Sequence, residues 1–228
     1  NGLGLVSIPP SLAGVAGLEV KSWIPARGNA VDRSVAFSPD SASIAFAWRR
    51  YSQDEGASSL YVAPVATPSA RRRVLTRATS PVWGAPGIAA SRQGRVRTEV
   101  TLEGKRFSMV EIVPTQIWTV RPDGTGARRV TGFRWRAQGF SAGLIPAAWS
   151  PAGTHIAGTV GEISCEAAKA GVADITASAG KVQLLMKRTS ASPVAYSADG
   201  QRILVNDGCK GRKAKIEVVN VNGSARRT

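Results

Sequence analysis

Few residues in this chain could carry out catalysis. His155 is its only histidine, so a Ser-His-Asp triad or a histidine general base would have to use it. It lies between a turn and a short apolar segment, where a variable polar residue is the simpler interpretation. A G-x-x-x-x-G-K-[ST] phosphate loop does not occur, and the acidic residues are scattered. The sequence therefore predicts no catalytic residue and no cofactor.

The potential metal ligands are equally sparse. Cys165 and Cys209 are the only two cysteines, and with a single histidine they do not match the usual spacing of zinc ligands. Asp54 and Glu55 share one loop and could bind a cation, but a solvated loop is the simpler interpretation of this pair. We expect no metal site.

Positive charge is the strongest signal of the composition. The chain has 30 Lys and Arg residues against 15 Asp and Glu residues, a net charge of +15. Such a charge fits an anionic partner, for example nucleic acid, a cell-wall polymer or acidic lipid. The alternative is a solvated basic surface, which we favour because many of the charges recur at one position of a repeat. These are Arg71, Arg72, Arg73, Arg128, Arg129, Arg226 and Arg227.

The elements that would position these residues are copies of one four-stranded unit, clearest in residues 34–76. A short apolar strand at 34–37 is followed by the turn Ser38-Pro39-Asp40-Ser41, where Asp40 is expected to accept a backbone hydrogen bond. Residues 44–48 are almost continuously apolar, which predicts a strand buried on both faces. The third and fourth strands are predicted at 60–65 and 71–76, with charge protecting the last edge.

This unit recurs along the chain. The turn returns after Trp149 and after Tyr196, with an eroded copy after Trp83. The interval from Trp83 to Trp149 is longer than the others, which predicts an inserted hairpin, assigned to the charged segment 93–108 and projecting from one face. Further third strands are predicted at 117–120, 182–185 and 216–219.

Four short strands in a repeat of this length are typical of propeller blades. The segments AFSPDSASIAF, IWTVRPDGTGARRVT and AYSADGQRIL resemble the TolB-like, WD40-like β-propeller repeat, over about residues 34–228. We therefore predict an all-β fold, a β-propeller of four-stranded antiparallel blades with about five blades in view, either a small ring or a fragment of a larger one. Residues 1–228 are predicted to form one domain. Its blades are 1–33 (partial), 34–76, 77–131, 147–189 and 190–228.

The resemblance implies an interaction platform and not an enzyme. TolB-like proteins are known mainly for protein–protein contacts in the cell envelope, so we expect a protein partner and a periplasmic, envelope or secreted location. An anionic polymer is a second candidate partner, and nucleic acid fits less well. The alternative function is that of an accessory propeller domain in a larger serine hydrolase or peptidase, with the catalytic domain outside this chain. No run of about 18 apolar residues occurs, so no transmembrane segment is predicted.

Loops between second and third strands are the candidate binding surface. The residues predicted to make contacts there are Arg49, Arg50, Tyr51, Lys210, Arg212 and Lys213. Cys165 and Cys209 follow the second strands of neighbouring repeats, and adjacent loops can bring two Cα atoms within the roughly 4.4–6.8 Å that a disulfide needs. We expect a bridge, which would indicate an oxidising compartment, with two free thiols as the alternative.

Overall fold

The computed structural model is almost entirely β-sheet, which confirms the all-β prediction. It describes residues 3–5, 21–24, 29–50, 58–102, 105–132, 143–161, 170–189, 191–207, 215–224 and 226–227. Within these residues the one helical element is the 3-10 turn η1 (Pro68–Ala70). No helix of the described part is long and apolar enough to cross a membrane.

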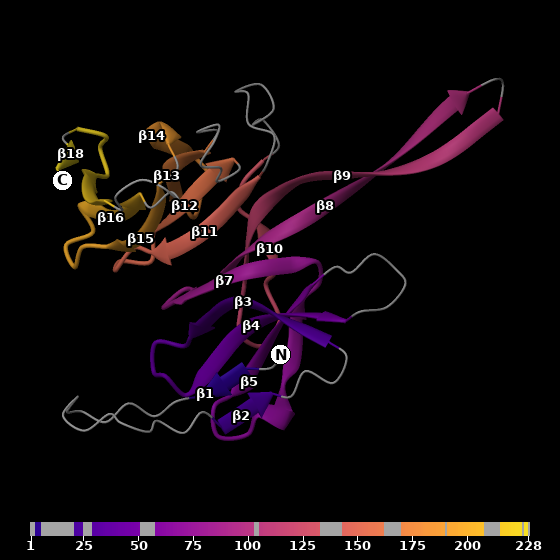
Figure 1. Cartoon of the computed structure of the whole chain (residues 1–228), viewed down its shortest axis with the longest axis horizontal. Helices are drawn as coiled ribbons and strands as arrows, with labels where there is room; N and C mark the ends of the chain where they lie inside the picture. Colours follow the sequence, from indigo (N-terminus) through magenta and orange to yellow (C-terminus); the bar gives the residue numbers. More distant parts are fainter. Residues whose placement is uncertain are drawn as a thin grey trace.

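Four antiparallel four-stranded sheets follow one another along the chain, and in each the strands lie in chain order (Figure 1). The first sheet contains β3 (Asn29–Phe37), β4 (Ser43–Arg50), β5 (Ser59–Pro64) and β6 (Arg72–Leu75). The second contains β7 (Ala78–Gly84), β8 (Gly87–Leu102), β9 (Lys105–Val120) and β10 (Arg128–Arg129). The third contains β11 (Leu144–Trp149), β12 (His155–Gly161), β13 (Ala170–Thr176) and β14 (Val182–Thr189). The fourth contains β15 (Ser192–Tyr196), β16 (Arg202–Asp207), β17 (Lys215–Asn220) and β18 (Arg226–Arg227), and β1 (Leu3–Leu5) pairs separately with β2 (Lys21–Ile24).

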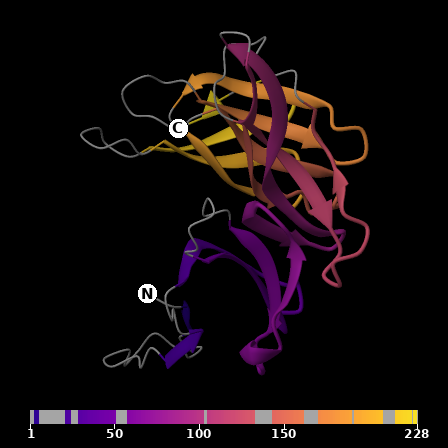
Figure 2. The ribbon, with the colours of Figure 1, turned by 90° about the vertical axis from the view of Figure 1, so that its right-hand side faces the viewer.

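The sheets are the blades of an incomplete propeller. Each sheet packs against the next, and Figure 2 shows the first and fourth sheets at the two ends of an open arc. A separate apolar core fills each of the three spaces between neighbouring sheets. In β4, Ala45 packs in the core shared with the second sheet and Ile44 and Phe46 pack in a further apolar cluster with Ala63, so residues 44–47 are all buried. This double coverage explains why the strand reads as a continuous apolar run.

The turns after the first and third strands use aspartate as the sequence predicts. The Oδ1 atoms of Asp40, Asp123 and Asp199 each accept a hydrogen bond from the backbone N–H two residues on, at 2.8 to 3.0 Å. A hydroxyl from a neighbouring Ser or Thr also donates to each carboxylate and is the main reason that their pKa values lie below the ordinary one. Ser41 takes a left-handed φ of 58° at the position where Gly200 has 70°. The turn geometry is thus kept even where the repeat lacks its glycine.

The second sheet accounts for the long repeat interval. The predicted extra hairpin exists, but it is a continuation of β8 and β9 and not a separate element. Both strands are 16 residues long and stay paired from Ile88 and Val120 to Leu102 and Lys105, past one irregularity near Gly94. Figure 1 shows this hairpin reaching away from the rest of the molecule.

The third sheet corrects one strand prediction. Residues 182–185 were expected to form its third strand, but they belong to β14, the fourth. The third strand is β13, with the sequence AGVADIT, in which six of seven residues are buried. Small side chains hide this strand in the sequence, because its burial comes from the two sheets that flank it and not from bulky residues of its own. The first strand of the first sheet also begins earlier than expected, at Asn29.

Candidate binding site at the turn end of the sheets

Each sheet has two chemically distinct ends. Because the strands of every sheet lie in chain order and antiparallel, the connections after the first and third strands share one end, here called the turn end. The connections after the second strands share the opposite end, here called the loop end. The binding residues predicted from the sequence belong to the loop end, whereas both of the cavities considered below lie at the turn end.

The predicted loop-end residues are not brought together in the described part of the structure. Arg49 and Arg50 finish β4, where their backbones pair with Ala30 and Asn29. Tyr51, Lys210, Arg212 and Lys213 lie outside the described residues, as do Cys165 and Cys209. The binding loops and the disulfide therefore remain predictions.

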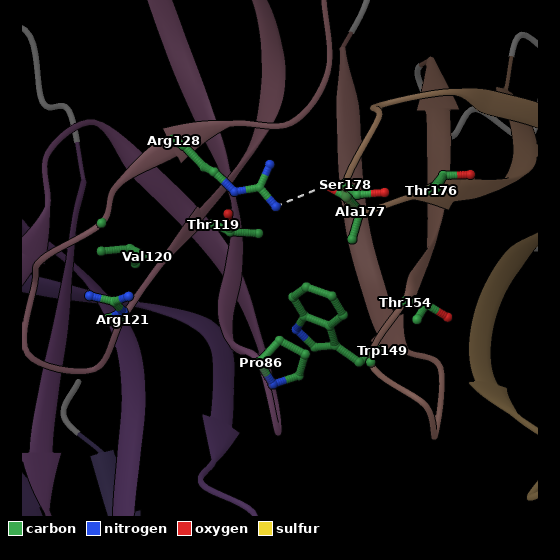
Figure 3. Close-up of a pocket in the computed structure, with 12 residues that line it drawn as sticks. Pro86, Thr119, Val120, Arg121, Arg128, Trp149, Thr154, Thr176, Ala177 and Ser178 are labelled. Carbon is green, nitrogen blue, oxygen red and sulfur yellow. Dashed lines mark hydrogen bonds between the residues drawn. The ribbon is translucent and has the colours of Figure 1, made fainter.

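The first cavity, of about 540 Å³, lies between the turn ends of the second and third sheets (Figure 3). The second sheet contributes Pro86, from the turn before β8, and Arg121 and Arg128 from around the turn between β9 and β10. From the third sheet come Trp149, at the end of β11, and the turn that follows β13 at Ala177. The walls therefore belong to turns that are far apart in sequence.

The position of Trp149 depends on a close contact with the second sheet. The indole packs directly on Gly84, where an added Cβ would lie 2.7 Å from Trp149 Cγ. Glycine is the residue that leaves room for this ring. The indole Nε1 is buried and has no hydrogen-bond partner among the residues that the structure describes. A buried N–H without an acceptor costs about 1–3 kcal/mol, so a ligand acceptor at this point would be favourable.

Arg128 spans the cavity. Its guanidinium Nη2 donates to the carbonyl of Ala177 at 3.0 Å, from β10 to the turn of the next sheet (Figure 3). Arg72, at the same position of the preceding repeat, donates to the carbonyl of Pro122 at 2.8 Å. Arginines of the basic fourth strands thus link neighbouring sheets. From the sequence alone, we expected these charges only to protect sheet edges and to keep the surface solvated.

The cavity is positively charged. Arg121 and Arg128 are its charged lining residues, and no Asp or Glu is among the described residues that line it. The nearby Asp123 is already hydrogen-bonded within its own turn by Thr125. Two guanidinium groups, a buried indole N–H and several hydroxyls together present donors to an anionic group such as a carboxylate.

A second cavity of about 560 Å³ lies between the turn ends of the third and fourth sheets. Its polar lining includes Asp174 of β13, Tyr196 of β15 and His155 at the start of β12. The Tyr196 hydroxyl donates to Asp174 Oδ1 at 2.5 Å, and His155 Nε2 lies 3.9 Å from Asp174 Oδ2. His155 is thus a cavity residue, although the described residues include no group of three His, Cys, Asp or Glu that could hold a metal ion.

Sequence reasoning missed both cavities. Trp149 and Tyr196 were recognised only as the aromatic residues that precede each turn. The sequence did contain one signal for a binding site: both side chains are large and amphipathic, and each precedes a turn whose residues differ between repeats. What faces each ring across the gap depends on the neighbouring sheet and could not be read from the repeat.

Comparison with known proteins relies on the fold, since no protein-family model and no curated protein matches the chain. TolB from Acinetobacter baumannii is 15% identical with a TM-score of 0.55, over 91% of this chain and 45% of that one. The oligogalacturonate lyase of Vibrio parahaemolyticus is 11% identical with a TM-score of 0.57, over 92% of this chain and 56% of that one. A puromycin-hydrolyzing peptidase of Mycobacterium tuberculosis is 14% identical with a TM-score of 0.53, over 88% of this chain and 30% of that one.

These similarities show that the chain has a TolB-like β-propeller fold. It spans 45% of the TolB chain, 56% of the lyase chain and 30% of the peptidase chain. Because two of the three are named as a lyase and a peptidase, the fold by itself is compatible with more than one kind of activity.

Proposed function

We propose that this chain is a non-enzymatic interaction scaffold that binds an acidic segment of a protein partner in the cavity between the second and third sheets. The observation that carries the proposal is the cavity wall with Arg121 and Arg128, beside a Trp149 Nε1 that has no partner among the described residues. A carboxylate placed there would accept from the indole and from a guanidinium. Hydrogen bonds that involve a charged group contribute about 1.5–3 kcal/mol each.

The net charge supports the same ligand class. At +15 the protein attracts anions over distances of about a Debye length, which raises association rates for acidic partners. This attraction is non-specific, so specificity must come from the cavity. An anionic polymer is the second ligand class that this chemistry would accept.

Fluorescence anisotropy with labelled hexaglutamate tests the proposal. Arg121→Ala is expected to weaken binding at least fivefold at low salt, and Trp149→Phe to weaken it without any change in net charge. Arg106→Ala is the matched control, because it removes the same charge from an exposed site at the far end of β9. Equal effects of Arg121→Ala and Arg106→Ala would reduce the interaction to bulk electrostatics and refute the site. Polygalacturonate of matched charge tests the polymer alternative.

We also propose that the protein acts in the periplasm, in the cell envelope or outside the cell. The support is the sequence resemblance and the predicted bridge between Cys165 and Cys209. Intact mass after alkylation under denaturing conditions tests the bridge. The mass should rise only if the protein is reduced first, and alkylation without reduction would contradict it.

A second candidate is an accessory propeller domain of a larger hydrolase. It is favoured by the similarity to the mycobacterial peptidase, of which the aligned part is 30%. The mass and terminal sequences of the native product decide between the two. A product near 23.9 kDa supports the scaffold, and a much larger product with a hydrolase domain supports the accessory domain.

A further inference from the structure

We propose that the cavity between the third and fourth sheets is a second binding site, which takes the ammonium group of a lysine side chain on the carboxylate of Asp174. This site is separate from the cationic cavity and has the opposite charge preference. It does not depend on the function proposed above.

Asp174 is a buried carboxylate that is only partly satisfied. The residue is 9% exposed and lines the cavity from β13. Its Oδ1 accepts the Tyr196 hydroxyl, whereas its Oδ2 has His155 Nε2 at 3.9 Å, beyond hydrogen-bond distance. An ionised carboxylate has about four acceptor positions, and donors from the described residues fill one of them, which leaves capacity for a ligand. Burying such a group is costly unless a cation or several donors approach it.

Tyr196 fixes the carboxylate from the opposite sheet. It belongs to β15, so its hydrogen bond to Asp174 crosses the space between the third and fourth sheets. Burial, together with the bond to Asp174, raises the pKa of Tyr196 far above its ordinary value. The hydroxyl is the donor because a carboxylate can only accept, and this bond from β15 fixes one oxygen of Asp174 at the cavity wall.

The other charged groups around the cavity leave Asp174 as the natural anchor for a cation. Asp199 also lines the cavity, but it is exposed and forms an ion pair with Arg202 at 3.5 Å. His155 hydrogen-bonds to Thr154 through Nδ1, at 3.0 Å, and when protonated it would compete with a ligand for Asp174 Oδ2. Because no third metal-binding side chain joins these groups among the described residues, an ammonium group fits better than a metal ion.

The blocked tripeptide acetyl-Ala-Lys-Ala-amide provides the probe, with norleucine in place of lysine as the uncharged isostere. NMR titration of the full chain should shift the His155 and Tyr196 ring signals with the lysine peptide and not with the norleucine peptide. Asp174→Asn keeps an acceptor for Tyr196 and should lower the affinity at least tenfold. Asp40→Asn, an equal charge change in an exposed turn of the first sheet, should leave it unchanged.

His155→Gln provides a second, independent variant. It removes the imidazole that lies 3.9 Å from Asp174 Oδ2 and should leave the lysine affinity equal or higher, so a tenfold loss in this variant would count against the site. Equal shifts with the lysine and norleucine peptides would overturn the site and leave Asp174 and Tyr196 as a structural link between sheets. Undiminished lysine binding by Asp174→Asn would overturn it as well. Hexaglutamate binding should be unaffected by Asp174→Asn, so failure of this site is distinguishable from failure of the cationic one.

Discussion

The two cavities occupy equivalent places in the repeat but have opposite chemistry. In each, the aromatic residue before the turn faces a neighbouring sheet, as Trp149 does in the first cavity and Tyr196 in the second. The Trp149 donor has no acceptor in the described part of the chain and shares its cavity with two arginines, whereas the Tyr196 donor is bound to Asp174. The repeat therefore provides the pocket, and a few residues that differ between the repeats decide which charge it accepts.

The largest expected effect tests how the first cavity is built. Gly84→Ala places a methyl group 2.7 Å from Trp149 Cγ, so the ring or the second sheet must shift. We expect the free energy of unfolding to fall by about 3 kcal/mol, as for overpacked cores. Urea denaturation measures it, with Gly132→Ala as the control because an added Cβ there has nothing within 4 Å. Similar losses in both variants would mean that Trp149 is not held by Gly84.

The second prediction tests the bond that characterises the second cavity. Tyr196→Phe removes the hydroxyl that donates to the buried Asp174, which should cost about 2 kcal/mol of unfolding free energy. Tyr61→Phe is the control, since that ring stacks on Phe46 and its hydroxyl makes no hydrogen bond within the described part of the chain. If both variants are equally stable, the Tyr196–Asp174 bond contributes nothing to the folded state.

A third, smaller effect concerns the arginine that spans the first cavity. Arg128→Ala removes the hydrogen bond to the Ala177 carbonyl and should cost about 1 kcal/mol. Arg73→Ala removes an equal charge from an exposed fourth-strand site in the first sheet and should be close to neutral. Thermal unfolding of the two variants at matched salt compares them. A neutral Arg128→Ala would mean that the hydrogen bond to Ala177 contributes nothing measurable to stability.

The last prediction is a pH dependence limited to the second cavity. The pKa of Tyr196 is higher in the folded than in the unfolded state. Its contribution to stability is therefore full below about pH 10, the ordinary tyrosine pKa, and falls as the pH rises above it. Between about pH 10 and 11.5 the wild type should lose more unfolding free energy than Tyr196→Phe does. Parallel losses, followed by urea denaturation at each pH, would contradict the buried hydroxyl.

Prediction from sequence succeeded where the cause is local. The turn role of Asp40, Asp123 and Asp199 was predictable because a short carboxylate reaches the backbone two residues on, whatever the surroundings. It failed for β13, whose small residues become buried only because two sheets enclose them. The predicted binding loops at residues 49–51 and 210–213 lay at the loop end, whereas the observed cavities lie at the turn end.

The sequence by itself determined that the chain repeats a four-stranded unit of the kind found in propeller blades. It also determined where most of the turns fall. Both features depend on residues that are neighbours along the chain. Only the tertiary structure decided that Trp149 meets Gly84, that Arg128 reaches Ala177 and that Tyr196 meets Asp174. The physical reason is that each of these contacts joins two sheets. Their partners are set by how one blade packs on the next, and no pattern within a single repeat encodes that.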